Sequence, residues 1–147
     1  MMTDMQYFED KASGFVIVAL KYGDDLFQCL EQVARACDVH TGVLTSGIGS
    51  LTEAYIHTVD SNDYPPKEKY LRLQGPLEVV QFGGIIADYA PHIHISLWDE
   101  NRNYFGGHVH EGCKVLALSE ISIHKLGELR LTRKATDDSG IQHLVRA

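Results

Sequence analysis

Residues 91–110 read PHIHISLWDENRNYFGGHVH, and the pattern of this segment sets the architecture expected for the whole chain. Polar and apolar side chains alternate from His92 to Trp98, which is typical of a strand with one buried face. A polar loop of hairpin length, residues 99–103, leads into a second strand that ends in Gly106-Gly107-His108-Val109-His110. The segment therefore predicts an antiparallel hairpin with its isoleucines facing the core and its histidines on the opposite face.

The register of this hairpin brings histidines from the two strands together. If the residues that flank the polar loop pair with each other, His94 lies opposite His108, and His92 lies opposite His110. Directly opposite Cβ atoms are roughly 5 Å apart, so rings from both strands can reach one cation at about 2.1 Å. We predict that His92, His94 and His108 bind a metal ion, with His110 as a candidate fourth ligand.

Three histidines with an open fourth position are typical of a zinc site that keeps a water molecule. Imidazole also suits other divalent transition metals, and the spacing does not choose among them. The alternative is that these histidines face solvent or hydrogen-bond at an interface. The glycine pair before His108 permits a bulge or a close approach of two backbones. The remaining histidines stand alone in the sequence, and a structural role is expected for each: His40, His57, His124 and His143.

The rest of the chain predicts one helix among many strands. Residues 14–20 have the composition of a buried strand, and Asp25 and Gln28 are spaced as a capping box for a helix that ends within residues 38–42. These elements indicate an α+β domain over residues 1–134, with an antiparallel or mixed sheet and a covering N-terminal helix, followed by a polar C-terminal tail at residues 135–147. The later strands are expected at residues 43–46, 51–59, 70–73, 77–87, 92–98, 104–110 and 114–126.

Length and composition are those of one ordinary globular domain. The 147 residues contain no apolar run long enough to span a bilayer, and the first ten residues do not resemble a secretory signal. We therefore expect a cytoplasmic protein that does not enter a membrane. Three cysteines without Cys-x-x-Cys spacing indicate neither a disulfide framework nor a thiolate zinc site. Thirteen basic side chains against 20 acidic ones give a net charge of −7, which disfavours direct binding to nucleic acid.

Three further features have alternative interpretations. Gly47-Ile48-Gly49 lies between two expected strands, and it is either a tight turn that needs positive φ or a cradle for a phosphate. Glu120 interrupts an apolar strand. It is either half of a salt bridge or a weak candidate for catalysis, as a general base or as the acceptor that orients a ligating histidine. Residues 77–82 and 115–118 are apolar on both strand faces, which favours a subunit interface over a closed barrel.

Several of these segments together resemble the plants-and-prokaryotes-conserved (PPC) domain family, in the stand-alone form found in bacteria and archaea. The resemblance covers roughly residues 8–126. It implies a compact α+β fold with a central antiparallel sheet, a homotrimer, and metal binding by His92, His94 and His108, whereas His110 lies outside the family's set. The matching segments are a Gly-Asp-Asp-Leu helix start, Ser46-Gly47-Ile48-Gly49-Ser50-Leu51, Gly75-Pro76-Leu77-Glu78-Val79, Pro91-His92-Ile93-His94, Phe105-Gly106-Gly107-His108-Val109 and Ser119-Glu120-Ile121.

Plant members of this family join the domain to AT-hook segments that bind A·T-rich DNA, and this chain contains no Arg-Gly-Arg-Pro hook. We therefore expect a homotrimeric protein that holds zinc or another divalent transition metal. Its expected role is small-molecule binding or metal-assisted hydrolysis. The alternative is a DNA-binding or transcription-associated assembly module that acts with a basic partner.

Overall fold

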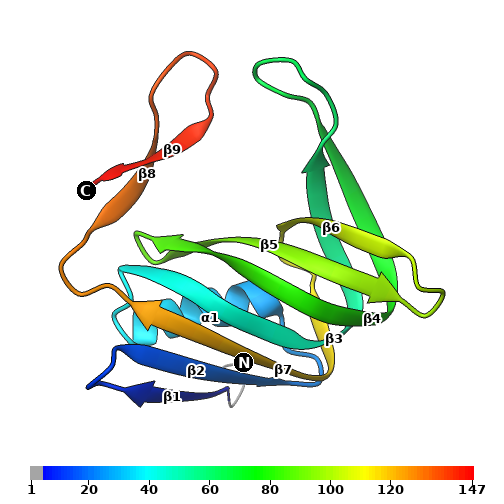
Figure 1. Ribbon diagram of the computed structural model, residues 1–147, viewed down its shortest axis with the longest axis horizontal. Coiled ribbons are helices and arrows are strands. Elements are labelled where there is room, and N and C mark those ends of the chain that lie inside the picture. The colour runs from blue at the N-terminus through cyan, green and yellow to red at the C-terminus, as the bar shows by residue number, and fades with distance from the viewer. Residues whose placement is uncertain (1–4) are drawn as a thin grey trace.

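The computed structural model of this protein describes residues 5–147 (Figure 1). Seven strands form one sheet in the order β1-β2-β7-β3-β4-β5-β6, and two more strands form a separate hairpin. Every strand pairing among the described residues is antiparallel. The elements are β1 (Gln6–Asp10), β2 (Phe15–Lys21), α1 (Leu26–Ala36), β3 (Thr41–Val59), β4 (Glu68–Ala87), β5 (Ala90–Asp99), β6 (Tyr104–Val109), β7 (Lys114–Lys125), β8 (Leu131–Ala135) and β9 (Gln142–Arg146).

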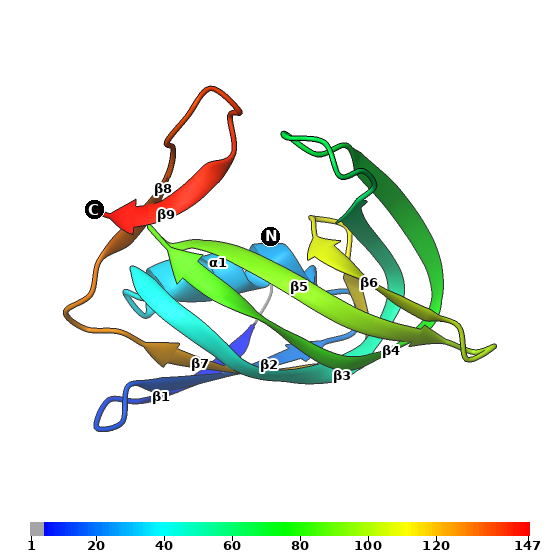
Figure 2. The same ribbon diagram turned by 45° about the horizontal axis from the view of Figure 1, so that its top comes forward.

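The sheet is strongly curved because β3 and β4 are long and bend along their length. They contain 19 and 20 residues, and their far ends project as an arm in Figure 1. β6 pairs with β5 on one side and with the far part of β3 on the other, so β3, β4, β5 and β6 close into a ring. The helix α1 packs against β2 and β5, and Figure 2 shows the sheet curving beneath it.

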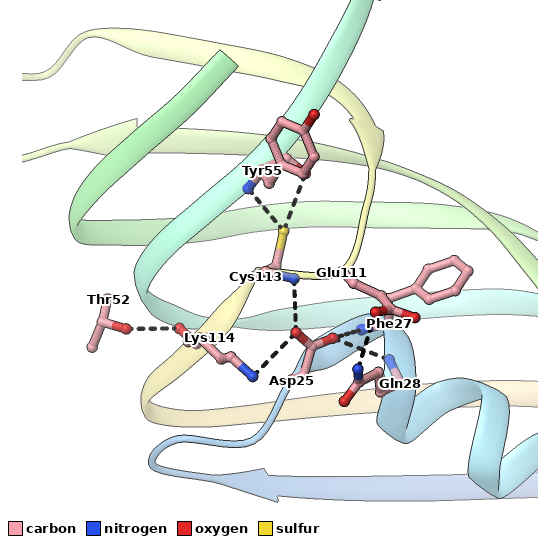
Figure 3. Close-up of polar contacts among 9 residues, drawn as sticks. Asp25, Phe27, Gln28, Thr52, Tyr55, Glu111, Cys113 and Lys114 are labelled. Atoms are coloured by element: carbon pink, nitrogen blue, oxygen red, sulfur yellow. Dashed lines mark hydrogen bonds and ion pairs between the residues drawn. The ribbon is translucent and has the colours of Figure 1, made fainter. Parts of the chain in front are cut away.

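Asp25 caps α1, as the sequence predicts. Its side chain is 5% exposed, and one carboxylate oxygen accepts the backbone N–H groups of Phe27 and Gln28 at 3.1 Å each. The other oxygen accepts the N–H of Gly112 at 2.8 Å and lies 3.3 Å from Lys114 Nζ (Figure 3). Asp25 therefore ties the start of the helix to the turn between β6 and β7.

The second half of the predicted capping box has a different partner. Instead of returning to the backbone of Asp25, the Gln28 amide donates to Glu111 at 3.1 Å (Figure 3). In the same turn, the thiol of Cys113 accepts the N–H of Tyr55 at 3.4 Å and donates to the carbonyl oxygen of Tyr55 at 3.5 Å. The turn that follows His110 is thus held by the helix on one side and by β3 on the other.

Two of the predicted strand breaks are absent, since β3 and β4 run through them. Gly47-Ile48-Gly49 is therefore neither a turn nor a phosphate cradle, but part of a continuous strand with β-bulges on either side of it against β7. A Cβ at Gly47 would overlap the ring of Phe82, and one at Gly49, where φ is 149°, would meet the backbone of Ser119. These glycines permit close packing.

Two of the other expected elements differ from the prediction. The single helix has 11 residues and follows β1 and β2, so it is a short internal helix rather than an N-terminal cover. The segment expected as a polar tail from residue 135 contains β9, which pairs with β8. The base of this hairpin is anchored to the sheet, because Leu131 N–H donates to Thr41 Oγ1 at 2.9 Å and Asp88 N–H donates to the Leu131 carbonyl at 3.1 Å.

The surface of the sheet that points away from the core carries a group of apolar side chains. Its members are 42–48% exposed and come from β2, β7, β3 and β4, which are neighbours in the sheet. Each has at least one buried neighbour along its strand, namely Val18, Gly47, Val79 or Ser119, so these side chains face outward. We call this group the apolar face, and it consists of Ile17, Ile48, Val80 and Leu118.

The described residues contain no helix long and apolar enough to cross a membrane.

Replacing Asp25 with alanine is expected to lower the free energy of unfolding by about 2–4 kcal/mol. The substitution removes the helix cap and leaves the N–H of Gly112 and the ammonium group of Lys114 without their acceptor. Denaturant titration measures this loss. Asp25→Asn, which keeps an acceptor oxygen for the helix, should cost less. The matched control Asp63→Ala, in an exposed loop, should cost less than about 0.5 kcal/mol; equal losses in Asp25→Ala and Asp63→Ala would contradict the prediction.

Candidate metal centre

The β5–β6 hairpin has the predicted register where the two strands pair. Trp98 lies opposite Tyr104, and His94 lies opposite His108. His92, His94 and His108 each offer a ring nitrogen, and these three atoms lie within 4.8 Å of one another. The sequence therefore identifies a histidine group that the fold does bring together.

His110 does not pair with His92, contrary to the predicted register. The strand β6 ends at Val109, and the N–H of His110 donates to the carbonyl of Tyr55 on β3 at 3.0 Å. His110 Nε2 lies 2.6 Å from His57 Nδ1, which is hydrogen-bond distance for two neutral imidazoles that share one proton. His110 thus joins a neighbouring histidine group on β3.

His57, expected to stand alone with a structural role, is instead part of this cluster. The strand β3 pairs with β6 so that His57 lies opposite His108, and their rings stack at 4.4 Å between centroids. Gly107 permits this approach, since a Cβ at that position would lie 2.5 Å from the His57 carbonyl oxygen. The glycine pair is in the sequence, but nothing local in the sequence shows that it faces β3 across 50 residues.

A carboxylate outside the predicted set faces the cluster. Glu68, at the start of β4, places one oxygen 3.5 Å from His57 Nε2, and its other oxygen accepts the hydroxyl of Tyr70 at 2.8 Å. With Nε2–H of His57 directed at Glu68, the lone pair of Nδ1 faces His110. Glu68 therefore favours the tautomer of His57 that carries its proton on Nε2.

Two overlapping groups of histidines can be distinguished, and they share His108: one contains His92 and His94, the other His57 and His110. A metal ion binds near the plane of each imidazole ring, so two stacked rings with parallel, offset planes cannot both direct a lone pair at one ion. His94 is inclined by 60° to His92 and by 67° to His108, and His92 is inclined by 41° to His108, whereas His57 and His108 are stacked and nearly parallel at 20°. The first group therefore has the geometry of a ligand set, and His57 backs His108 by stacking.

The electrostatic environment keeps these rings neutral. Burial lowers the pKa of His108 most, and the nearby rings, His57 first, lower it further to about 3. The pKa of His92 is lowered by burial and then by the guanidinium of Arg133, and that of His94 by burial and then by His57. Burial also lowers the pKa of His110. A neutral imidazole presents the lone pair that a metal ion requires.

Glu120, the weak catalytic candidate, lies away from this cluster. It occupies the centre of β7, opposite Ala19 on β2 and Ile48 on β3, and its side chain is exposed beside the apolar face. Neither histidine group includes it. The other single histidines also lie outside the cluster: His40 contacts Thr41, His124 stacks on Phe15, and His143 contacts Thr136.

Two of the cavities that border the histidines share His94. One, of about 690 Å³, is lined by His57, His94 and Tyr104 among others. The other, of about 520 Å³, lies between the sheet and the β8–β9 hairpin and is lined by His92, His94 and Arg133 among others. In both Figure 1 and Figure 2 the hairpin and the β3–β4 arm project on the two sides of β5.

The tips of these two projections are in contact. The hydroxyl of Tyr64, in the loop of the β3–β4 arm, donates to the carboxylate of Asp137, in the loop of the hairpin, at 2.7 Å. The hydroxyl of Ser139 and then this bond from Tyr64 lower the pKa of Asp137 to about 2, so the acceptor stays charged. The two projections therefore form an arch.

With this geometry established, comparison with known proteins places the chain. The Plants and Prokaryotes Conserved (PCC) domain matches residues 7–127. The chain belongs to this family. Bifunctional protein GlmU of Synechococcus sp. (strain JA-3-3Ab) is 30% identical over 122 residues, which are 83% of this chain and 19% of that protein. The chain thus spans about a fifth of the length of this curated relative. The family match ends before the β8–β9 hairpin.

Solved structures share the PCC fold. A protein of Bacteroides thetaiotaomicron, provisionally named as DNA-binding, has a TM-score of 0.85 and 16% identity, over 98% of this chain and 99% of that one. A metal-containing protein of Archaeoglobus fulgidus has a TM-score of 0.77 and 22% identity, over 99% of this chain and all of that one. At these identities the likeness shows the α+β fold with its antiparallel sheet.

The metal-free protein is expected to lose stability as the pH falls from about 7 to about 5. The pKa of His108 in the folded protein, about 3, lies below the ordinary value of 6.5. Between these values the unfolded chain binds a proton that the folded chain does not, so acid favours unfolding. Denaturant titrations in the presence of a chelator measure the slope. His108→Gln should flatten it, and the control His124→Gln should not; a wild-type stability independent of pH in this range would refute the prediction.

Proposed function

We propose that this PCC-domain protein binds one divalent transition metal ion, zinc by preference, through His92, His94 and His108. The observation that carries the proposal is the mutual inclination of these three rings around ligand atoms that lie within 4.8 Å of one another. The structure of the metal-containing relative from Archaeoglobus fulgidus has the same fold, which supports the proposal. His110 is the candidate for a fourth ligand, but its contact with His57 favours a supporting role.

The cluster fits such an ion with small adjustments. Ligands at about 2.1 Å in a tetrahedral site are about 3.4 Å apart, so the three rings need to close by no more than about 1.5 Å. Rotation of the side chains supplies this movement, because His94 is exposed and His92 and His108 are only partly buried. All three rings are neutral at pH 7 and need no deprotonation before binding.

A zinc ion held by three histidines leaves a coordination position open, and there it acts as a Lewis acid toward a small ligand. The residues of this chain supply the surroundings. The two cavities border the ligand set, and the arch from Tyr64 to Asp137 spans the region between the hairpin and the arm. This arrangement supports small-molecule binding or metal-assisted hydrolysis, as the sequence suggests.

We also propose that the protein assembles as a homotrimer through the apolar face. Four apolar side chains that are 42–48% exposed and lie on neighbouring strands of the sheet would be covered by a neighbouring subunit, and closed rings are the ordinary symmetry of such assemblies. The direct DNA-binding alternative is favoured by the provisional names of structures such as those from Bacteroides thetaiotaomicron and Ralstonia eutropha, and the net charge of −7 opposes it. A band shift with duplex DNA at low salt, shown by the chain alone, would revive it.

Metal content tests the first part of the proposal. Wild-type protein purified from zinc-supplemented cells should hold about one ion per chain, measured by inductively coupled plasma mass spectrometry. His92→Ala and His94→Ala should weaken retention at least about tenfold, because each removes a ligand. His124→Ala removes a half-buried histidine that stacks on Phe15, outside the cluster, and serves as the matched control. Equal metal content in all four proteins would overturn the proposal.

Sedimentation tests the second part. The wild type should sediment at about three times the mass of the 16.4 kDa chain. Ile48→Glu and Leu118→Glu place charges in the apolar face and should yield smaller species, whereas Tyr22→Glu, at a side chain that is 73% exposed outside this face, should not. A wild-type protein that sediments as one chain would exclude the trimer.

A further inference from the structure

The β8–β9 hairpin brings a guanidinium group to the edge of the histidine cluster. Arg133 on β8 lines the cavity of about 520 Å³ together with His92 and His94. The pairing of Arg133 with Leu144 places Gln142, two residues along β9, on the same face of the hairpin, and Gln142 also lines the cavity. The family match ends at residue 127, so these polar groups lie beyond the matched domain.

Arg133 has donors that its surroundings do not satisfy. Its one hydrogen bond is from Nη2 to the carbonyl of Ile85, at the long distance of 3.4 Å. Its Nε is buried and has no hydrogen-bond partner. None of the ion pairs formed by the described residues includes Arg133. A buried donor without an acceptor costs free energy, and such a group in a native structure is commonly explained by a missing partner.

The lining of this cavity carries no negative charge. It contains two histidines of the proposed ligand set, a third histidine, one arginine and one amide, but no aspartate or glutamate. In a chain with a net charge of −7, a cavity lined by one cation and without acidic groups is suited to an anion. A guanidinium offers adjacent N–H donors at the spacing of two oxygens of a carboxylate or phosphate.

We propose that Arg133 binds the oxyanion group of a small ligand, a carboxylate or a phosphate, beside the metal centre. The guanidinium turns its unsatisfied Nε–H and one Nη–H toward the two oxygens, and the Gln142 amide is the nearest additional donor on the same face. This inference rests on the proposed function for the metal, but the oxyanion site uses residues that are not ligands. It narrows the class of ligand for the centre to small acids and phosphate esters.

Phosphate and acetate are suitable probes, each titrated separately by calorimetry into zinc-loaded protein and into chelator-treated protein. We expect the wild type to bind at least one of them, and Arg133→Gln to weaken that binding at least about tenfold. Arg133→Lys should fall between the two, because a lysine keeps the charge but not the paired donors. The anion that loses more affinity identifies the preferred oxyanion. Arg146→Gln removes the same charge from an exposed position on the same hairpin and should change nothing.

The outcomes separate this inference from the metal proposal. Metal content is measured on every variant, and Arg133→Gln should retain the wild-type amount. If wild type and Arg133→Gln bind both anions equally, or if the wild type binds neither, the oxyanion site is overturned while the metal proposal stands. If the wild type holds no zinc, and Arg133→Gln nevertheless binds the anion more weakly than the wild type does, the metal proposal fails and the oxyanion site stands. Circular dichroism spectra and unfolding midpoints test whether Arg133→Gln is folded. If Arg133→Gln does not fold, the comparison of Arg133→Lys with the wild type still tests the site.

Discussion

The double pairing of β6 is the constraint on which the rest of this structure depends. A six-residue strand joins β5 on one edge and the far part of β3 on the other. This pairing forces β3 and β4 to bend back, closes four strands into a ring, and puts His94, His108 and His57 in one row across three strands. Gly107 is required for it, because any side chain there would meet the His57 carbonyl. The same small region therefore controls both the topology and the histidine cluster.

Local patterns were enough to predict much of this fold. Alternation and loop length identified the β5–β6 hairpin and the pairing of His94 with His108, and the cap at Asp25 follows from the residues around it. The contacts that were missed are those between segments far apart in the chain. His57 pairs with a residue 51 positions away, and its isolation in the sequence says nothing about that strand pairing. The continuous strand through Gly47 was missed for the same reason, since the glycine accommodates Phe82 from another strand.

The C-terminal hairpin shows that a polar composition alone does not indicate an unpaired tail. Residues after 135 are polar enough to suggest a tail, yet β8 and β9 pair over five positions and are anchored to Thr41 and Asp88 at their base. A strand with little apolar content is stable here because its backbone is paired and its tip is bonded to Tyr64. Such a hairpin adds few residues to the core, so its side chains remain free to line a cavity.

The relation between the two histidine groups follows from ring geometry rather than from proximity. His57 is closer to His108 than His92 or His94 is, with ring centroids at 4.4 Å against 4.7 and 5.6 Å, but two stacked rings with nearly parallel planes cannot both direct a lone pair at one ion. Stacking instead restricts the rotation of His108, and Glu68 restricts His57 in turn. A carboxylate that orients a histidine is the usual support behind a metal ligand. Here the ring of His57 lies between the carboxylate of Glu68 and the proposed ligand His108. Glu68 therefore orients His57 by a polar contact, and His57 orients His108 by stacking.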